Sequence, residues 1–186
     1  MSVRERLSAE EGVERLRSAL GQKVEGVEVS FGHLVATCAV GDLREVVTAL
    51  RDEPGLRFEY FTFLSAVDRS EFGGADKPEK HGGLELLIHL YSPAHVIHIN
   101  LHVPLDLADP RCPSIADIFG GANWHEREMR DMFGIQFEGH PNLTPIYLPE
   151  DFEGHPLRRD FKLPSRSFIK PWPGAKDPEE AAAGGR

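Results

Sequence analysis

The stretch LELLIHLYSPAHVIHINLHVPL, residues 84–105, determines the fold class that the sequence predicts. Apolar and polar residues alternate in two runs, roughly 84–91 and 95–103, with Pro93 between them. A period of two residues is typical of strands that bury one face. We therefore predict a β-hairpin whose second strand points Ile97, Ile99 and Leu101 toward a core.

The same stretch is the only candidate for a membrane span, because residues 86–105 are 20 residues without a formal charge. However, they include four histidines, Asn100 and two prolines, and their apolar residues alternate with polar ones instead of forming one continuous apolar stretch. Residues 1–14 alternate Arg and Glu and lack the apolar centre of a secretory signal. We predict no membrane span and no signal peptide.

The polar face of the hairpin carries His89, His98 and His102. One permitted register places His89 directly opposite His98. Two imidazoles facing each other can bind zinc, but the pattern supplies no third ligand. We favour a polar sheet face that a loop or a partner covers.

Outward from the hairpin, the pattern predicts helices over 8–20, 42–53 and 123–133, and strands over 24–31, 34–40 and 57–67. Ser8 and Glu11 form a capping box, and Asp42 opens the second helix. In the first strand, Val29 and Phe31 share the expected apolar face. Residues 68–83 are rich in glycine and charge, which indicates a surface loop. We predict an α+β domain over residues 1–134, a mixed β-sheet with helices packed on one face.

The C-terminal part is different, because eight of the 14 prolines follow residue 140. That density excludes a regular helix or a central strand. Residues 135–173 nevertheless keep many large apolar side chains. We expect this long extended Pro-rich C-terminal segment to lie along a partner, and residues 174–186 to be a disordered tail.

Composition excludes several functions. The chain has 186 residues and a formal charge of −9, which disfavours binding to nucleic acid. Its two cysteines, Cys38 and Cys112, are too few for an iron–sulfur cluster and lie in no CxxC motif, so we expect reduced thiols in a cytoplasmic protein. The sequence contains no glycine-rich nucleotide motif.

The helix predicted over 123–133 is rich in charge. Asn123 and Glu126 fit a capping arrangement, and Glu126–Arg130 and Arg127–Asp131 have the spacing of ion pairs along one helix. A catalytic carboxylate pair is the alternative. Because each acid has an arginine within one turn, we favour ionised, structural carboxylates.

The sequence FEGHP occurs twice, at 137–141 and 152–156. In each copy the glycine permits a tight bend and the proline keeps the preceding histidine extended. We predict two bends in the extended segment, with metal binding by His140 and His155 as the alternative. Arg158 and Arg159 follow, and their forks suit carboxylates or phosphates of a partner.

These motifs together resemble the family of the C subunit of NADH-quinone oxidoreductase, which is respiratory complex I. The matching pieces are EREMRDMFGI at 126–135, GHP at 139–141, LPED at 148–151 and GHPLRRDF at 154–161. Shorter matches extend the resemblance over most of residues 30–162. Thr144-Pro145 stands where the family often has basic residues, and Arg159 where lysine is common.

The resemblance implies a non-catalytic scaffold subunit of the peripheral arm, on the cytoplasmic side of the bacterial cell membrane. The complex passes electrons from NADH through FMN and Fe–S clusters to quinone and translocates protons. FMN and the clusters belong to other subunits, so no catalytic, cofactor or metal residues are expected on this chain. Its chief partner is expected to be the large quinone-site subunit. The expected interface residues are Glu126, Arg127, Asp131, His140, Pro141, His155, Pro156, Arg158, Arg159 and Asp160.

Two alternatives remain open at this point. The chain fits an equivalent scaffold subunit of a related membrane-bound hydrogenase-type complex. It also fits, less well, a freestanding metalloprotein that uses its histidines.

Overall fold

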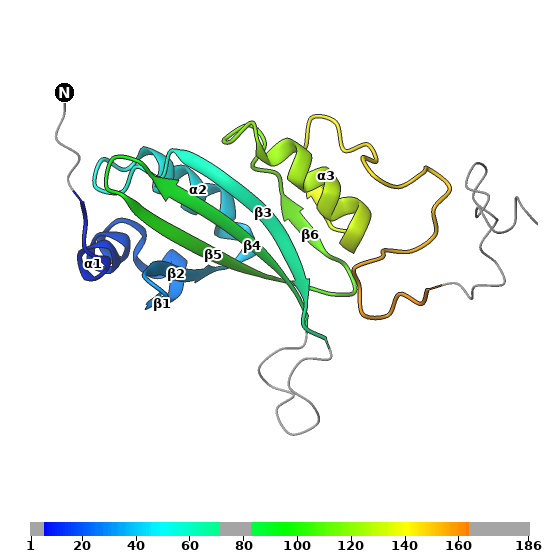
Figure 1. Cartoon of the computed structure of the whole chain (residues 1–186), viewed down its shortest axis with the longest axis horizontal. Coiled ribbons are helices and arrows are strands. Elements are labelled where there is room, and N and C mark those ends of the chain that lie inside the picture. The colour runs from blue at the N-terminus through cyan, green and yellow to red at the C-terminus, as the bar shows by residue number, and fades with distance from the viewer. Residues whose placement is uncertain (1–5, 71–82, 164–186) are drawn as a thin grey trace, which may run out of the picture.

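The computed structural model describes residues 6–70 and 83–163. The main elements, in chain order, are α1 (Ala9–Leu20), β1 (Val24–Ser30), β2 (His33–Cys38), α2 (Leu43–Asp52), β3 (Tyr60–Asp68), β4 (Leu84–Ser92), β5 (Ile97–Leu105), β6 (Arg111–Pro113), α3 (Ala122–Phe133) and β7 (Gln136–Glu138). Figure 1 shows the strands β3, β4 and β5 as one twisted sheet, with α2 behind it and α3 to one side. The predicted α+β class is confirmed. Most of the loop predicted at 68–83 and all residues after 163, including the predicted tail 174–186, lie outside the described residues.

The main sheet has five strands in the order β1-β2-β5-β4-β3. Neighbouring strands are antiparallel except β2 and β5, which are parallel, so the sheet is mixed as predicted. The predicted hairpin over 84–105 forms its middle as β4 and β5. Alternate residues of these two strands are buried, as the sequence pattern indicates.

Helices α1 and α2 cover the apolar face of this sheet. A side chain at Gly12 of α1 would meet Leu34 and Ile97, which places α1 directly over β2 and β5. The capping box of Ser8 and Glu11 is present at its start. In contrast, Asp42 makes no side-chain cap at the start of α2. The buried stripe of α2, with Val46, Val47 and Leu50 among its members, completes the core.

The prediction for the apolar face of the first strand is wrong. Val29 and Phe31 do not point into the core: Phe31 is fully exposed, at 102% of its reference area, and lies in the turn after β1. The pairing of β1 with β2 shifts register between Glu25 and Glu28, beside Gly26 at φ +59°, and β1 is an edge strand. A bulge of this kind reverses which residues face inward.

The register of the hairpin also differs from the one that would place His89 opposite His98. His89 pairs with Asn100, and His98 pairs with Tyr91, because the connection places Ser92 opposite Ile97. The shift is an even number of residues, so the histidines stay on one face. His98 Nδ1 and His89 Nε2 lie 3.2 Å apart along a diagonal.

Helix α3 lies along the outer edge of β3, where the Nδ1–H of His125 donates to the carbonyl of Leu64 at 3.0 Å. After α3 the chain forms β7, which pairs in parallel with β6 as a second, two-stranded sheet. Ile135 and Phe137 are buried in the core. The segment predicted to begin at residue 135 therefore starts inside the domain, although the boundary itself stays a prediction.

Candidate functional site

The chain after β7, residues 139–163, forms what we name the return segment. It runs back past α3, and its two Gly-His-Pro sequences meet the two ends of that helix (Figure 1). The Nε2–H of His140 donates to the carbonyl of Asn123 in the first turn at 3.2 Å. The Nδ1–H of His155 donates to the carbonyl of Asp131 near the last turn at 2.9 Å. Both preceding glycines have positive φ angles, +79° and +89°, so the two predicted bends are confirmed.

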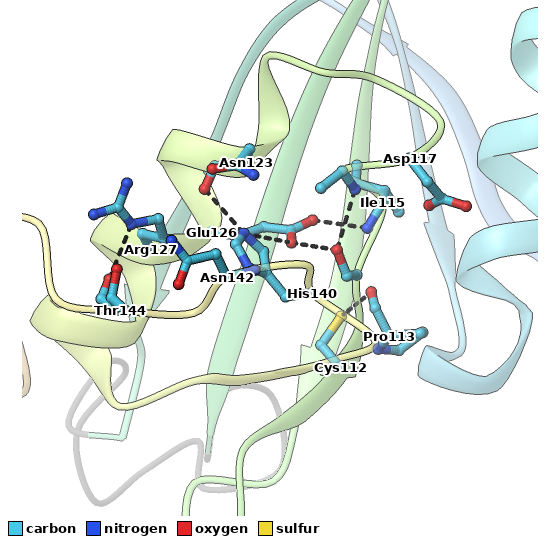
Figure 2. A network of polar contacts seen from close by, with 12 residues as sticks. Cys112, Pro113, Ile115, Asp117, Asn123, Glu126, Arg127, His140, Asn142 and Thr144 are labelled. Carbon is cyan, nitrogen blue, oxygen red and sulfur yellow. Dashed lines mark hydrogen bonds and ion pairs between the residues drawn. The ribbon is translucent and has the colours of Figure 1, made fainter.

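At the first bend, Glu126 is the centre of a buried polar cluster (Figure 2). Its Oε2 accepts a hydrogen bond from the Ser114 hydroxyl at 2.6 Å, and its Oε1 accepts one from the Ile115 N–H at 2.7 Å. His140 Nε2 lies 3.8 Å from Oε2, and both side chains are 0% exposed. Glu126 thus joins the chain after β6 to the return segment.

The capping and ion-pair predictions for Glu126 are wrong. The residue before α3 is Gly121, which provides no side-chain cap, and the Glu126 carboxylate turns toward Ser114 rather than Arg130. The reason is tertiary: the buried N–H and O–H donors of residues 114 and 115 outcompete an exposed pair along the helix.

Burial also changes the charge state of Glu126. Removal from water raises its pKa to about 7, although the hydrogen bonds from Ser114 and Ile115 oppose the shift. The negative charge of Asp117 adds to the rise, and Arg44 of α2 opposes it. The expectation of an ordinary ionised carboxylate does not hold for this residue near neutral pH.

Asp131, the second buried acid of α3, behaves in the opposite way. Its Oδ2 accepts three backbone N–H groups, from Ile146 at 2.9 Å, Tyr147 at 2.9 Å and Leu148 at 3.2 Å. Burial raises its pKa, but these bonds and Arg130 outweigh burial and keep the pKa below its ordinary value. The carboxylate is therefore ionised and fixes the turn over residues 146–148.

Asp131 does not pair with Arg127, so this predicted ion pair is also wrong. The Arg127 guanidinium instead donates to the carbonyls of Thr144 at 2.9 Å and Pro145 at 3.0 Å. Arg127 and Asp131 of α3 thus both bind backbone groups of the return segment. Their spacing along the helix does not indicate these contacts.

At the second bend, the return segment satisfies the last carbonyls of α3. Besides the His155 contact, the Leu157 N–H donates to the Met132 carbonyl at 3.1 Å, and Arg158 Nε donates to the Phe133 carbonyl at 2.6 Å. These carbonyls have no partner within the helix. The Arg159 N–H donates to Asp68 Oδ2 at 2.9 Å, which ties the segment to the end of β3.

The structure therefore divides the expected interface residues. Six of them bind groups of the chain itself through their side chains: Glu126, Arg127, Asp131, His140, His155 and Arg158. Pro141, Arg159 and Asp160 are exposed, and Pro156 is half-buried. Whether any of the ten meets a partner stays a prediction.

Several of the large apolar side chains that the C-terminal segment was expected to carry are exposed, and so is one of α3, which sequence reasoning did not single out. Tyr147 is 63% exposed and Trp124 of α3 is 60% exposed. The other members are Phe152, Leu157 and Leu163. Together these five residues are named the apolar set. No sequence signal separates them from core residues, because the return segment has no regular period.

On the open sheet face, the rings of His33, His89 and His98 lie against one another, with centroids 4.7–5.6 Å apart. His33 and His98 stack with ring centroids 4.7 Å apart and an interplanar angle of 20°, and His89 stacks against Phe63 on the other side. Within residues 6–70 and 83–163, no group of three or more His, Cys, Asp or Glu side chains is placed to hold a metal ion. None of the helices in the described residues is long and apolar enough to cross a membrane.

Comparison with known families gives a clear match. The model of the family described as "Respiratory-chain NADH dehydrogenase, 30 Kd subunit" matches residues 36–167. Among curated proteins, three that are named as the C subunit of NADH-quinone oxidoreductase are similar to this chain. They are 37% identical in Methylobacterium radiotolerans, 38% in Salinispora arenicola and 40% in a Roseiflexus strain, each over 81–82% of this chain.

The aligned part spans 66% and 60% of the length of the first two relatives, and 82% of the Roseiflexus protein. Two solved structures have a similar fold. One is titled Nqo5 of the trypsin-resistant fragment (1-134), with 24% identity, a TM-score of 0.58 and coverage of 72% of this chain and 99% of that one. The other is an archaeal membrane-bound sulfane sulfur reductase, with 25% identity, a TM-score of 0.65 and coverage of 83% and 85%.

Proposed function

From the premise that this chain belongs to the family of the 30 kDa subunit of respiratory-chain NADH dehydrogenase, we propose that it is the C subunit of a proton-translocating NADH:quinone oxidoreductase. In this role it is a scaffold of the peripheral arm and performs no redox step itself. The complex, through FMN and Fe–S clusters on other subunits, passes electrons from NADH to quinone.

The arrangement of the return segment is the observation that supports this proposal. Hydrogen bonds of its polar and charged groups join it to α3, and the apolar set, which is four residues of the segment and Trp124 of α3, remains exposed. A segment fastened to a helix by many part-buried hydrogen bonds presents such side chains with little loss of conformational entropy on binding. Exposed aromatic residues of this kind are typical centres of protein–protein interfaces.

The proposed partner is the large quinone-site subunit, and the proposed location is the cytoplasmic side of the bacterial cell membrane. Two exposed members of the expected interface, Arg159 and Asp160, lie close in sequence to Leu157 of the apolar set. A charged rim beside an apolar centre is the usual anatomy of an interface. We expect Arg159 to set orientation and the apolar set to supply most of the affinity.

Replacement of Tyr147 and Leu157 by serine tests this proposal. Both side chains are exposed, so the chain should fold normally and lose co-purification with the other subunits from solubilised membranes. Phe31→Ser is the matched control, because Phe31 is also exposed and apolar but lies in the β1–β2 turn. Normal assembly of the Tyr147/Leu157 variant, or equal loss in the control, contradicts the proposal.

The second candidate is an equivalent scaffold in a related respiratory membrane complex. The likeness to the archaeal membrane-bound sulfane sulfur reductase, with a TM-score of 0.65, favours keeping it. Identification of the proteins that co-migrate with the chain on a native gel separates the two. An NADH-oxidising module in the same band supports the first candidate, and its replacement by a hydrogenase or sulfur-reducing module supports the second.

A further inference from the structure

The Glu126 cluster can exist in two protonation states, and each one leaves a different defect. When ionised, the carboxylate accepts the Ser114 and Ile115 hydrogen bonds, but its charge is fully buried with no cation in contact among the described residues. When protonated, the charge is gone, but the 2.6 Å contact between Oε2 and Ser114 Oγ holds only one hydrogen, so the Glu126 carboxyl and the Ser114 hydroxyl cannot both donate along it. Because each state has an unfavourable feature, their free energies are similar, and Glu126 gains or loses its proton within the physiological pH range.

His140 cannot neutralise this charge without giving up a bond. Its Nδ1 accepts the Asn142 N–H at 3.0 Å, so that nitrogen carries no proton, and its Nε2–H points to the Asn123 carbonyl. In the closed bend the ring thus uses both of its nitrogens in hydrogen bonds, with Nδ1 as the acceptor. Protonating it would break the Asn142 bond, which closes the turn after Pro141.

The other ionisable groups near Glu126 either have a partner already or stay neutral. Arg44 of α2 is engaged in a bidentate pair with Asp117, at 2.7 and 2.6 Å. Burial raises the pKa of the Cys112 thiol of β6, so it stays neutral. No neighbour in the described chain is free to absorb a change in the charge of Glu126.

We propose that Glu126, Ser114 and His140 form a proton-controlled latch, in which a proton on Glu126 holds the first bend of the return segment closed on α3. Opening the bend, residues 139–142, admits water to Glu126 and lets it ionise. The latch does not depend on the proposed function, because it acts within this chain. A partner that requires the closed bend would take up a proton on binding above pH 7.

The sign follows from linkage. Burial raises the pKa of Glu126 from 4.5 to about 7 in the closed bend. Closure is therefore favoured fully below pH 4.5 and loses this contribution as the pH rises to 7. With these two values, the open fraction should grow roughly tenfold between pH 6 and pH 8.5.

Hydrogen exchange of the full chain, followed by NMR, tests the latch. After correction for the intrinsic rates, the Asn142 and Ile115 amides should lose about tenfold protection between pH 6 and pH 8.5. In Glu126→Gln the amide mimics the protonated acid: its oxygen can accept from Ile115 and its NH₂ can donate to Ser114. This variant should show pH-independent protection.

Glu128→Gln is the matched control, because it removes the same charge from a half-buried position of the same helix. It should behave as the natural chain does. The carboxyl ¹³C signal of Glu126, which needs no variant, should titrate near pH 7. Titration near 4.5, flat protection across the range, or an unchanged pH response in Glu126→Gln would each overturn the proposal.

Discussion

The imidazole of His155 occupies the space that a side chain on Gly134 would need. A Cβ at Gly134 would lie 2.5 Å from His155 Nε2, and Gly134 has a φ angle of +76° as the C-terminal cap of α3. The glycine thus ends the helix and also leaves room for the second Gly-His-Pro bend. Helix termination and the path of the return segment depend on one residue.

Gly134→Ala should therefore destabilise the fold by about 2 kcal/mol, from left-handed backbone strain and displacement of His155. Urea unfolding measures the loss, and the Leu157 amide, bonded to Met132, should exchange faster. Gly120→Ala is the control, since nothing lies within 4 Å of its Cβ position. A variant as stable as the natural chain would show that the bend is not seated on Gly134.

Asp131→Asn should loosen one turn of the return segment without unfolding the domain. Asn keeps one acceptor oxygen but loses the charge that binds three N–H groups, at an expected cost of about 2 kcal/mol. The amides of residues 146–148 should lose protection while those of β4 and β5 keep it. Asp160→Asn, at an exposed position, should change neither. Equal effects of the two substitutions would rule out the carboxylate as the organiser of this turn.

Acid should weaken the same turn. The pKa of Asp131 lies below its ordinary value of 3.8 in the folded chain, so its contribution is present above pH 3.8 and is lost as the pH falls through the folded value. Asp68 has a lowered pKa as well: burial raises it, and the Ser70 and Arg159 hydrogen bonds outweigh burial. The free energy of unfolding should fall below pH 4, and less so in Asp131→Asn than in the natural chain. A parallel decline in both would contradict this.

The sequence predicts the middle of this fold better than its edges. Residues 84–105 alternate in two runs, and each strand pairs with a neighbour on both edges, so their period indicates β4 and β5. In β1, a bulge occurs at Gly26 that the apolar pattern does not predict, and the face expected to be buried is therefore exposed. The bends at Gly139 and Gly154 were predictable because glycine and proline act locally.

The contacts of α3 were not predictable in the same way. Glu126, Arg127 and Asp131 have the spacing of helical ion pairs, yet each binds a group more than ten residues away in the chain. Tertiary donors and acceptors prevail over exposed pairs because such pairs contribute only about 0.5 kcal/mol. The resemblance to a known family indicated that this region matters, but only the folded structure shows which groups its side chains contact.

The stacked imidazoles of the open sheet face should make stability depend on pH between 5 and 7.5. Burial lowers the pKa of His98, and the neighbouring His33 lowers it further; burial lowers that of His89, with added repulsion from His98 and His33. Their contribution is therefore present above pH 6.5 and is lost as the pH falls through the lower folded values.

His98→Phe keeps a stacked ring between His33 and Tyr91 and removes one titrating group. The variant should lose less stability than the natural chain when the pH is lowered from 7.5 to 5, as measured by urea unfolding. Thr37→Phe, a substitution in β2 that leaves the three imidazoles in place, is the control and should retain the full acid sensitivity. If His98→Phe also retains the full acid sensitivity, protonation of the stacked imidazoles does not limit stability.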